Sequence, residues 1–258
     1  MSKTIVMIHG AFAGAWSFEN FVDVFRSRGW TCHAPDLRFH GVIPNSDQEP
    51  HLARTSIEDY TDDMVAFIAG LDDAPIIIGH SMGGLVAQQL AAKGLARGLV
   101  LLTAGAPWGI LPSTSDEMAV AIGLMTTGPF WTKSIQPVFE VAAENALEKL
   151  DPNSRRQVFD KLGPESGRAL FELFFWMFDV RHAIAVDSTK IKCPVLVVSG
   201  SDDKVISAST GRRVAQLYGS NATYHEAQGH GHFLLLEPGW ESVAERCADW
   251  ILQHGASS

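Results

Sequence analysis

Charged residues, cysteines and long apolar runs are all scarce in this chain. Lysine, arginine, aspartate and glutamate make up only 19% of its 258 residues, and the net charge of −9 is spread without a basic stripe that could collect phosphates. Nucleic acid is therefore not an expected partner. No apolar stretch reaches the roughly 18 to 20 residues that a membrane-spanning helix requires, so no membrane segment is expected either.

The three cysteines, Cys32, Cys193 and Cys247, are odd in number and far apart in the sequence. This spacing favours reduced, buried thiols over a disulfide frame or a metal knuckle. The first apolar run, residues 5–8, is too short for the apolar region of a signal peptide. We therefore predict a cytoplasmic protein, with its oligomeric state left open between a monomer and a homodimer.

Apolar residues make up 46% of the chain, enough for the core of one sizeable domain. Runs of β-branched and aliphatic residues predict six strands, at 5–9, 31–34, 75–79, 98–103, 194–199 and 222–225. Four of these runs are almost continuously apolar, which is typical of strands buried on both faces of a parallel sheet.

Helical periodicity fills most of the segments between the predicted strands. It predicts helices at 18–28, 57–71, 82–93, 208–218 and 240–253. The second of these helices can begin with a capping box formed by Ser56 and Asp59. Strands that alternate with helices predict a doubly wound, mostly parallel α/β sheet of about six strands.

The alternation fails once, between Thr103 and Lys190, where helical stretches occur without a convincing strand. We predict a helical cap at 108–187, inserted after the fourth strand into a core formed by 1–107 and 188–258. The cap carries more large apolar side chains than a solvent-facing connection could leave exposed, so as a group they should cover something. For any single one, packing onto the sheet is the simpler role. The residues that we assign to the substrate pocket are Phe12, Trp108, Leu124, Phe130, Trp131 and Trp176.

A serine bracketed by two glycines, Gly79-His80-Ser81-Met82-Gly83, stands between an apolar strand and an Ala-rich helix. Such a turn forces the serine into a strained conformation, and the glycines leave room for the backbone on both sides. The five-residue motif alone is a weak signal, but its place between a buried strand and a helix is a strong one. A serine here could instead cap the helix, and we favour Ser81 as a nucleophile.

A serine hydroxyl is a poor nucleophile at neutral pH, so this interpretation requires a histidine base and a carboxylate that orients it. Residues 228–233 place two histidines in a Gly-rich loop after the last predicted strand. We choose His232 because it directly precedes an apolar run and the pair Glu237-Pro238. His230 is the alternative.

The carboxylate is expected where the fifth predicted strand ends, in Ser201-Asp202-Asp203. An acid at the carboxyl end of a strand can reach a histidine on the next loop. Asp203 is our choice and Asp202 its alternative. Either one gives the order serine, aspartate, histidine along the chain.

An acyl-transfer enzyme also needs donors for the oxyanion that develops, and backbone N–H groups can supply them. The first predicted strand ends in a turn that should lie beside the serine. We propose the N–H groups of Met82 and Ala11 as the pair, with Phe12 less favoured. His9 and His80 flank these turns, and we interpret both as structural residues that hold the loops.

Together these segments resemble the α/β-hydrolase superfamily. The His-Gly turn at 9–10, Gly-His-Ser-Met-Gly-Gly at 79–84, Gly-Ser-Asp-Asp at 200–203 and Gly-His-Phe at 231–233 fall in the family's order from end to end. The superfamily commonly has two strands before the first turn, and here they are missing. This short form is similar to small bacterial carboxylesterases and to the group of methylsalicylate esterases and hydroxynitrile lyases, whose opening segment residues 9–16 resemble.

Departures from the family pattern narrow the activity that the resemblance implies. The lyase branch has a threonine after the first histidine and a lysine after the catalytic one, where this chain has Gly10 and Phe233. The dehalogenase and epoxide-hydrolase branches have an aspartate where this chain has Ser81.

We therefore expect a serine carboxylesterase that cleaves esters of small to medium apolar substrates through an acyl-enzyme. No cofactor or metal is implied. Three alternatives stay open: hydrolysis of a lactone of the acyl-homoserine lactone type, an amide or a carbon–carbon bond; a non-hydrolytic lyase or oxygenase; and a non-catalytic receptor for a small ligand.

Overall fold

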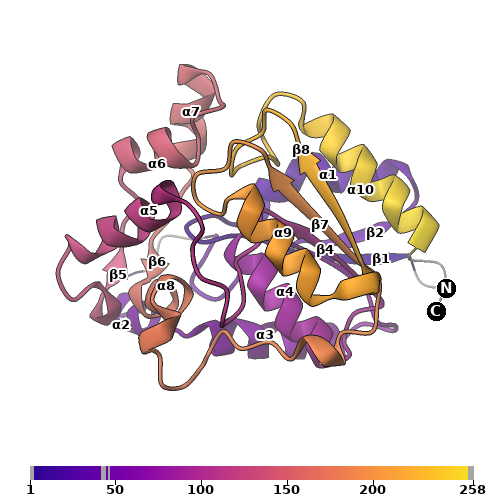
Figure 1. Cartoon of the computed structure of the whole chain (residues 1–258), viewed down its shortest axis with the longest axis horizontal. Helices are drawn as coiled ribbons and strands as arrows, with labels where there is room; N and C mark the ends of the chain where they lie inside the picture. The colour runs from indigo at the N-terminus through magenta and orange to yellow at the C-terminus, as the bar shows by residue number, and fades with distance from the viewer. Residues whose placement is uncertain (1–2, 42–44, 46, 255–258) are drawn as a thin grey trace.

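A six-stranded parallel sheet runs through the middle of the molecule (Figure 1), in a computed structural model that describes residues 3–41, 45 and 47–254. Its strands are β1 (Thr4–Ile8), β2 (Thr31–His33), β3 (Ile76–His80), β4 (Gly98–Leu102), β7 (Val195–Gly200) and β8 (Ala222–Ala227). They lie in the order β2-β1-β3-β4-β7-β8, and all neighbours pair in parallel. The predicted fold class is confirmed.

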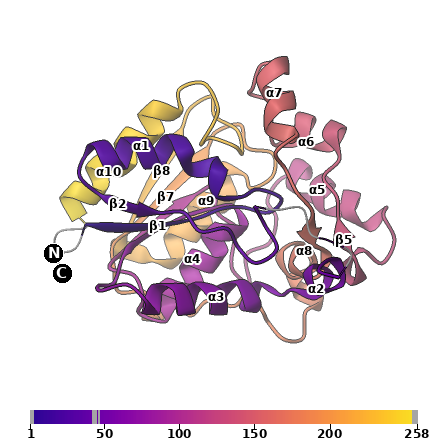
Figure 2. The same cartoon turned by 180° about the vertical axis from the view of Figure 1, so that it is seen from behind.

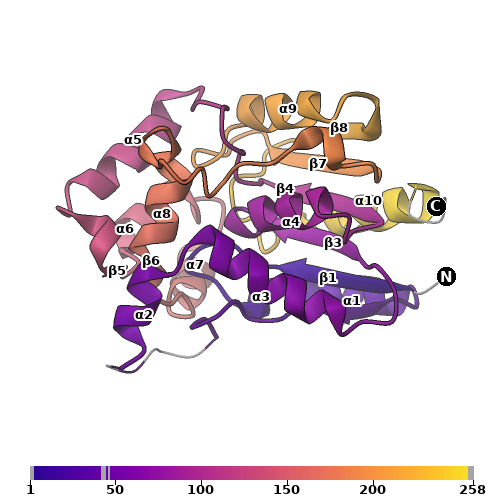
Figure 3. The same cartoon turned by 90° about the horizontal axis from the view of Figure 1, so that it is seen from below.

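Helices cover both faces of this sheet (Figure 2). On one face, α1 (Glu19–Ser27) and α10 (Trp240–His254) pack apolar side chains against the strands. On the other face lie α3 (Ile57–Ala69), α4 (Met82–Ala92) and α9 (Ala208–Leu217), as Figure 3 also shows. The chain passes from β1 outward to β2 and then back across to β3, so the carboxyl ends of β1 and β3 meet where the winding reverses. Ligand sites of such sheets lie at this kind of point.

The predicted helices are all present, with ends shifted by a few residues. The predicted capping box is present too, with Ser56 as the cap of α3 and Asp59 accepting from its backbone. A short helix that the sequence analysis did not predict, α2 (Glu49–Arg54), precedes α3. The buried thiols predicted for Cys32 and Cys247 are found, whereas Cys193 is only half-buried.

The segment between β4 and β7 extends beyond one end of the sheet (Figure 1). It contains α5 (Ser115–Met125), α6 (Phe139–Asn145), α7 (Pro152–Phe159) and α8 (Gly167–Phe174). The expectation that it has no strand is wrong, because β5 (Ser134–Ile135) and β6 (Glu165–Ser166) pair antiparallel. Strands of two residues are too short to show an alternating pattern in the sequence.

The large apolar side chains of this segment were expected, as a group, to cover something rather than face solvent, but several of them are exposed. Those left exposed are Trp108, Met125, Trp131, Met177 and Phe178.

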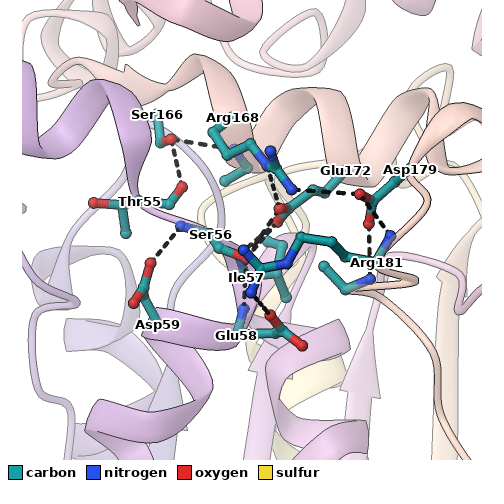
Figure 4. A network of polar contacts seen from close by, with 12 residues as sticks. Thr55, Ser56, Ile57, Glu58, Asp59, Ser166, Arg168, Glu172, Asp179 and Arg181 are labelled. Carbon is teal, nitrogen blue, oxygen red and sulfur yellow. Dashed lines mark hydrogen bonds and ion pairs between the residues drawn. The ribbon is translucent and has the colours of Figure 1, made fainter.

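A buried polar network joins the inserted segment to the start of α3 (Figure 4). The carboxylate of Glu172 in α8 accepts hydrogen bonds from the Ser56 hydroxyl at 2.9 Å and the Ile57 N–H at 2.8 Å. Arg168, one turn earlier in α8, also donates to it. This network fixes the position of α8 relative to the sheet.

Candidate active site

Ser81 occupies the sharp turn between β3 and α4, with φ 51° and ψ −122°. Its backbone is held on both sides, since its N–H donates to the Leu102 carbonyl at 3.1 Å and its carbonyl accepts from Gly84. A Cβ atom at Gly83 would lie 2.2 Å from the Ile8 carbonyl oxygen, so only glycine fits there. The Ser81 hydroxyl does not cap α4, which leaves it free for another partner.

That partner is His232, whose Nε2 lies 3.0 Å from Ser81 Oγ. The Nδ1 of His232 lies 2.9 Å from Oδ2 of Asp203. Because a carboxylate only accepts hydrogen bonds, Nδ1 carries the ring proton and Nε2 accepts from the serine hydroxyl. All three side chains are buried. The structure thus joins the three residues chosen from the sequence into one hydrogen-bonded chain.

The surroundings of Asp203 and His232 orient the carboxylate and set the basicity of the ring. Asp203 Oδ1 accepts from the N–H groups of Val205 at 2.8 Å and Ile206 at 2.9 Å. Burial lowers the pKa of His232, but the charge of Asp203 and the hydrogen bond to it outweigh that effect, so the pKa lies above its ordinary value. His232 is therefore a stronger base than an isolated imidazole.

The alternative residues point elsewhere. Asp202 forms an ion pair with Lys149 at the surface. The ring of His230 approaches Glu237, with its Nδ1 3.3 Å from Oε2. Within the described residues, neither side chain forms a hydrogen bond or ion pair with Ser81.

His80 and Thr103 hold the loop that carries His232. Both donate to the carbonyl oxygen of His232, His80 through Nε2 at 2.9 Å and Thr103 through its hydroxyl at 3.0 Å. Complete burial and the neighbouring His232 lower the pKa of His80 to about 3, so His80 stays neutral. It has the loop-holding role predicted for it.

The turn after β1 packs against the serine, and His9 orients the peptide that carries the Ala11 N–H. Nε2 of His9 accepts from the Leu37 N–H at 3.0 Å, so Nδ1 carries the proton and donates to the Gly10 carbonyl at 2.9 Å. The Gly10 carbonyl and the Ala11 N–H belong to one trans peptide and point in opposite directions. A Cβ atom at Gly10 would lie 2.9 Å from the Ser81 Cβ, which shows how closely the turn packs on the serine.

Among the described residues, no hydrogen-bond acceptor is found for the N–H of Ala11. The N–H of Met82 belongs to the first turn of α4, and the N–H groups of a helix's first turn have no partner within the helix. These are the two donors chosen from the sequence. The N–H of Phe12, the less favoured donor, already donates to Glu165 Oε2 at 3.2 Å. Phe12 itself has φ +64°, and its side chain is half-buried.

The aromatic residues assigned to the pocket fall into two groups. Trp108 contacts Trp176, with ring centroids 5.1 Å apart. Phe130 is fully buried and contacts Trp131 and Phe175 inside the inserted segment, so it packs that segment. The half-buried Leu124 lies in the last turn of α5.

Two features near the serine were not predicted from the sequence. The Leu173 side chain comes within 3.0 Å of the Cβ position at Gly105, whose N–H donates to the Ser81 carbonyl. His40, Tyr60 and Glu165 form a buried polar cluster behind Phe12. No motif in the sequence marks either feature. Among the described residues, no three side chains of the types that bind metals are grouped as ligands.

A strained serine between a parallel strand and a helix, with a histidine and an aspartate on later loops, is typical of α/β-fold hydrolases. The profile of the alpha/beta hydrolase family matches residues 5–246. The chain belongs to this family of hydrolases.

Three proteins similar to this chain are named as a pyrethroid hydrolase, a phospholipase and a methylesterase. A pyrethroid hydrolase of Sphingobium wenxiniae is 29% identical over 95% of this chain and 86% of its own length. Phospholipase YtpA of Bacillus subtilis is 25% identical over 93% of this chain and 91% of its own. The crystal structure of the Arabidopsis methylesterase MES16 superposes with a TM-score of 0.73 at 15% identity, over 96% of this chain and 98% of that one. Within the described residues, no helix has both the length and the apolar character to cross a membrane.

Proposed function

We propose that this protein is a serine carboxylesterase in which Ser81 is the nucleophile, His232 the general base and Asp203 the residue that orients the base. The observation that carries the proposal is the hydrogen-bonded chain from Ser81 Oγ through His232 to Asp203, at 3.0 and 2.9 Å. The Met82 N–H follows Ser81 directly at the start of α4, and the Ala11 N–H, in the turn that packs on Ser81, has no acceptor among the described residues. Relatives named as hydrolases and a methylesterase support ester hydrolysis.

In the first step, Ser81 Oγ attacks the acyl carbon of the ester while its proton passes to Nε2 of His232. The substrate's carbonyl oxygen becomes an oxyanion, which accepts from the Ala11 and Met82 N–H groups. His232 then gives the proton to the alcohol oxygen as the carbon–oxygen bond breaks. Asp203 stays ionised and stabilises the imidazolium that forms between these transfers.

In the second step, a water molecule attacks the acyl-enzyme. Its proton passes to Nε2 of His232, and the same N–H groups hold the second oxyanion. His232 returns the proton to Ser81 Oγ, and the carboxylic acid is released.

We propose that residues 108–187 act as a cap that shapes the pocket for a small to medium apolar substrate. Leu173 approaches the backbone beside Ser81, and Trp176 packs against the same core cluster as Ala11. The contact made by Leu173 favours an apolar group close to the serine, and Trp176 adds an apolar side chain to the same segment. The size of that group should appear as a sharp optimum when p-nitrophenyl esters of graded acyl length are compared.

The test is Ser81→Ala, assayed on the best ester of that series. We expect turnover to fall to background while the far-UV circular dichroism and the melting temperature stay close to those of the wild type. Ser242→Ala, an exposed serine at the start of α10, is the control and should keep full activity. A Ser81→Ala variant that retains most of the turnover would contradict the proposal.

Labelling by a fluorophosphonate probe separates this function from a non-catalytic receptor. The wild type should be labelled in a 1:1 ratio, and Ser81→Ala should not be labelled. Tight binding of an apolar ligand by a wild-type protein that is not labelled would favour the receptor instead.

A further inference from the structure

A buried carboxylate from the inserted segment reaches the turn that carries the Ala11 N–H. Glu165 lies in β6 and is fully buried. Its Oε2 accepts from the Phe12 N–H at 3.2 Å and faces His40 Nε2 at 3.0 Å. Its Oε1 accepts from the Tyr60 hydroxyl at 2.7 Å and from the Ser166 N–H at 2.7 Å. Four donors thus converge on one carboxylate.

These contacts define the charges of the pair. Only the ionised form of Glu165 offers acceptors to four donors at once. His40 faces the Arg38 carbonyl oxygen through Nδ1 at 3.0 Å and the carboxylate through Nε2. Both ring nitrogens therefore donate, and His40 is an imidazolium. Burial lowers the pKa of His40, but the charge of Glu165, the hydrogen bonds to Glu165 and to the Arg38 carbonyl, and the charge of Asp36 together outweigh burial and raise the pKa overall.

The same segment holds Phe12 from both sides. The Phe12 N–H donates to Glu165, and the Phe12 carbonyl accepts from the Gly163 N–H at 2.8 Å. Phe12 has φ +64°, a strained conformation for a non-glycine residue that persists only where its surroundings impose it. The inserted segment supplies both hydrogen bonds that impose it.

The Glu165–His40 ion pair also sets the net charge close to the expected oxyanion. An unpaired carboxylate bonded to Phe12, one residue after Ala11, would repel the negative charge that develops there. The imidazolium of His40 shares the same carboxylate oxygen and balances this charge. Glu165 can therefore orient the turn without opposing the reaction.

We propose that the Glu165–His40 ion pair is a positioning device, through which the inserted segment holds the Ala11 N–H in place for the oxyanion. This inference rests on the proposed esterase function. It implies that the cap does more than shape the pocket, because the oxyanion site is incomplete unless residues 163–165 are docked.

The test is Glu165→Gln. A glutamine presents its NH2 group to at least one of the four donors, so it cannot accept all four hydrogen bonds that Glu165 accepts. We expect kcat for the best p-nitrophenyl ester to fall roughly ten- to hundredfold, since an oxyanion donor alone contributes about a hundredfold or more. KM should change less than about twofold. The affinity for a trifluoromethyl ketone, which forms an oxyanion on Ser81, should fall by a factor similar to that of kcat.

Glu172→Gln is the matched control. Glu172 is another fully buried carboxylate of the inserted segment, and its contacts run to the start of α3 and to Arg168 rather than to Phe12 (Figure 4). Both variants should have lower melting temperatures than the wild type. Only Glu165→Gln should lose kcat and inhibitor affinity when both are assayed below their melting temperatures.

A second variant keeps the test decisive if Glu165→Gln does not fold. His40→Gln retains a donor toward Glu165 but removes the positive charge, and kcat should fall roughly three- to tenfold with KM unchanged. Wild-type kcat in either folded variant, while Ser81→Ala is inactive, would overturn the role of the ion pair and leave the esterase proposal standing. Full activity in Ser81→Ala would overturn both.

Discussion

The Nδ1–H of His9 donates to the carbonyl oxygen of Gly10 at a distance of 2.9 Å, and this bond sets the direction of the next N–H along the chain. The ring can donate there because its other nitrogen accepts from Leu37. Burial and the charge of His40 lower the pKa of His9 to about 4, so the ring stays neutral and keeps this tautomer at neutral pH. His9 thereby orients the N–H group of Ala11, which we propose as a donor to the oxyanion.

Removing this ring should impair the reaction more than substrate binding. We expect His9→Ala to lower kcat roughly ten- to hundredfold, because small misplacements of a catalytic group cost about that much, with little change in KM. Steady-state kinetics on a p-nitrophenyl ester measure both. His51→Ala removes an exposed histidine of α2 and should leave kcat unchanged. If the two variants had the same kcat, the role of His9 would be excluded.

Adjacent aspartates allow a sharp test of the acid. Asp203→Asn removes the charge that faces His232 Nδ1, and we expect kcat to fall by roughly three to four orders of magnitude, as when the orienting acid of a serine–histidine pair is lost. Asp202→Asn removes only a surface ion pair with Lys149. Its kcat should stay within about twofold of the wild type. A larger loss in Asp202→Asn than in Asp203→Asn would reassign the acid.

The pH profile should report His232. Its pKa lies above the ordinary value of 6.5, because the charge of Asp203 and the hydrogen bond to it outweigh the opposing effect of burial. A general base must be unprotonated, so kcat/KM should rise with pH and reach half its maximum above pH 6.5. In Asp203→Asn the residual activity should reach half-maximum at a lower pH. An acidic limb at or below pH 6.5 in the wild type would contradict this assignment.

The raised pKa of His232 also predicts how the free energy of unfolding changes with pH. Because the pKa of His232 is higher in the folded protein, its protonation contributes stability that is fully present below pH 6.5 and is lost as the pH rises through the folded value. We expect the free energy of unfolding of wild type to decrease over that range relative to His232→Asn. Urea unfolding at a series of pH values measures the difference, and a difference that increases with pH would have the wrong sign.

Patterns that are local in sequence predicted most of this molecule. The buried strands and the serine between Gly79 and Gly83 follow from short-range rules: continuous apolar runs, glycine where backbones touch, and a helix directly after a strand. The structure joins Ser81 to His232 and Asp203 rather than to His230 and Asp202, and this choice depends on how two loops meet in space.

Contacts between distant segments could not be predicted in the same way. Glu165 follows Gly163-Pro164 in what reads as a loop, and Tyr60 reads as one more residue on the apolar face of its helix. Each becomes informative only when the fold brings them together with His40, more than a hundred residues from Glu165 along the chain. The exposure of several aromatic residues in the inserted segment was not predicted for a related reason. Composition indicates that apolar side chains need to be buried, but not which of them are buried.

Substitutions at two glycines test how much the close contact between the serine turn and β1 contributes to stability. A Cβ atom at Gly83 would lie 2.2 Å from the Ile8 carbonyl oxygen and 2.3 Å from that of His9, both backbone atoms of a central strand and its turn. Gly83→Ala should therefore lower the free energy of unfolding by more than about 3 kcal/mol, beyond the usual range for overpacking.

Gly123, inside α5, is the matched control because a Cβ atom there meets nothing within 4 Å. Gly123→Ala should raise the free energy of unfolding by about 0.5–1 kcal/mol, since alanine loses less conformational freedom in a helix. Urea unfolding measures both variants. Any Gly83→Ala protein that folds must also move β1, and with it the Ala11 N–H, so its kcat should fall as well. A Gly83→Ala variant with wild-type stability and kcat would mean that β1 and the serine turn can separate without affecting the site.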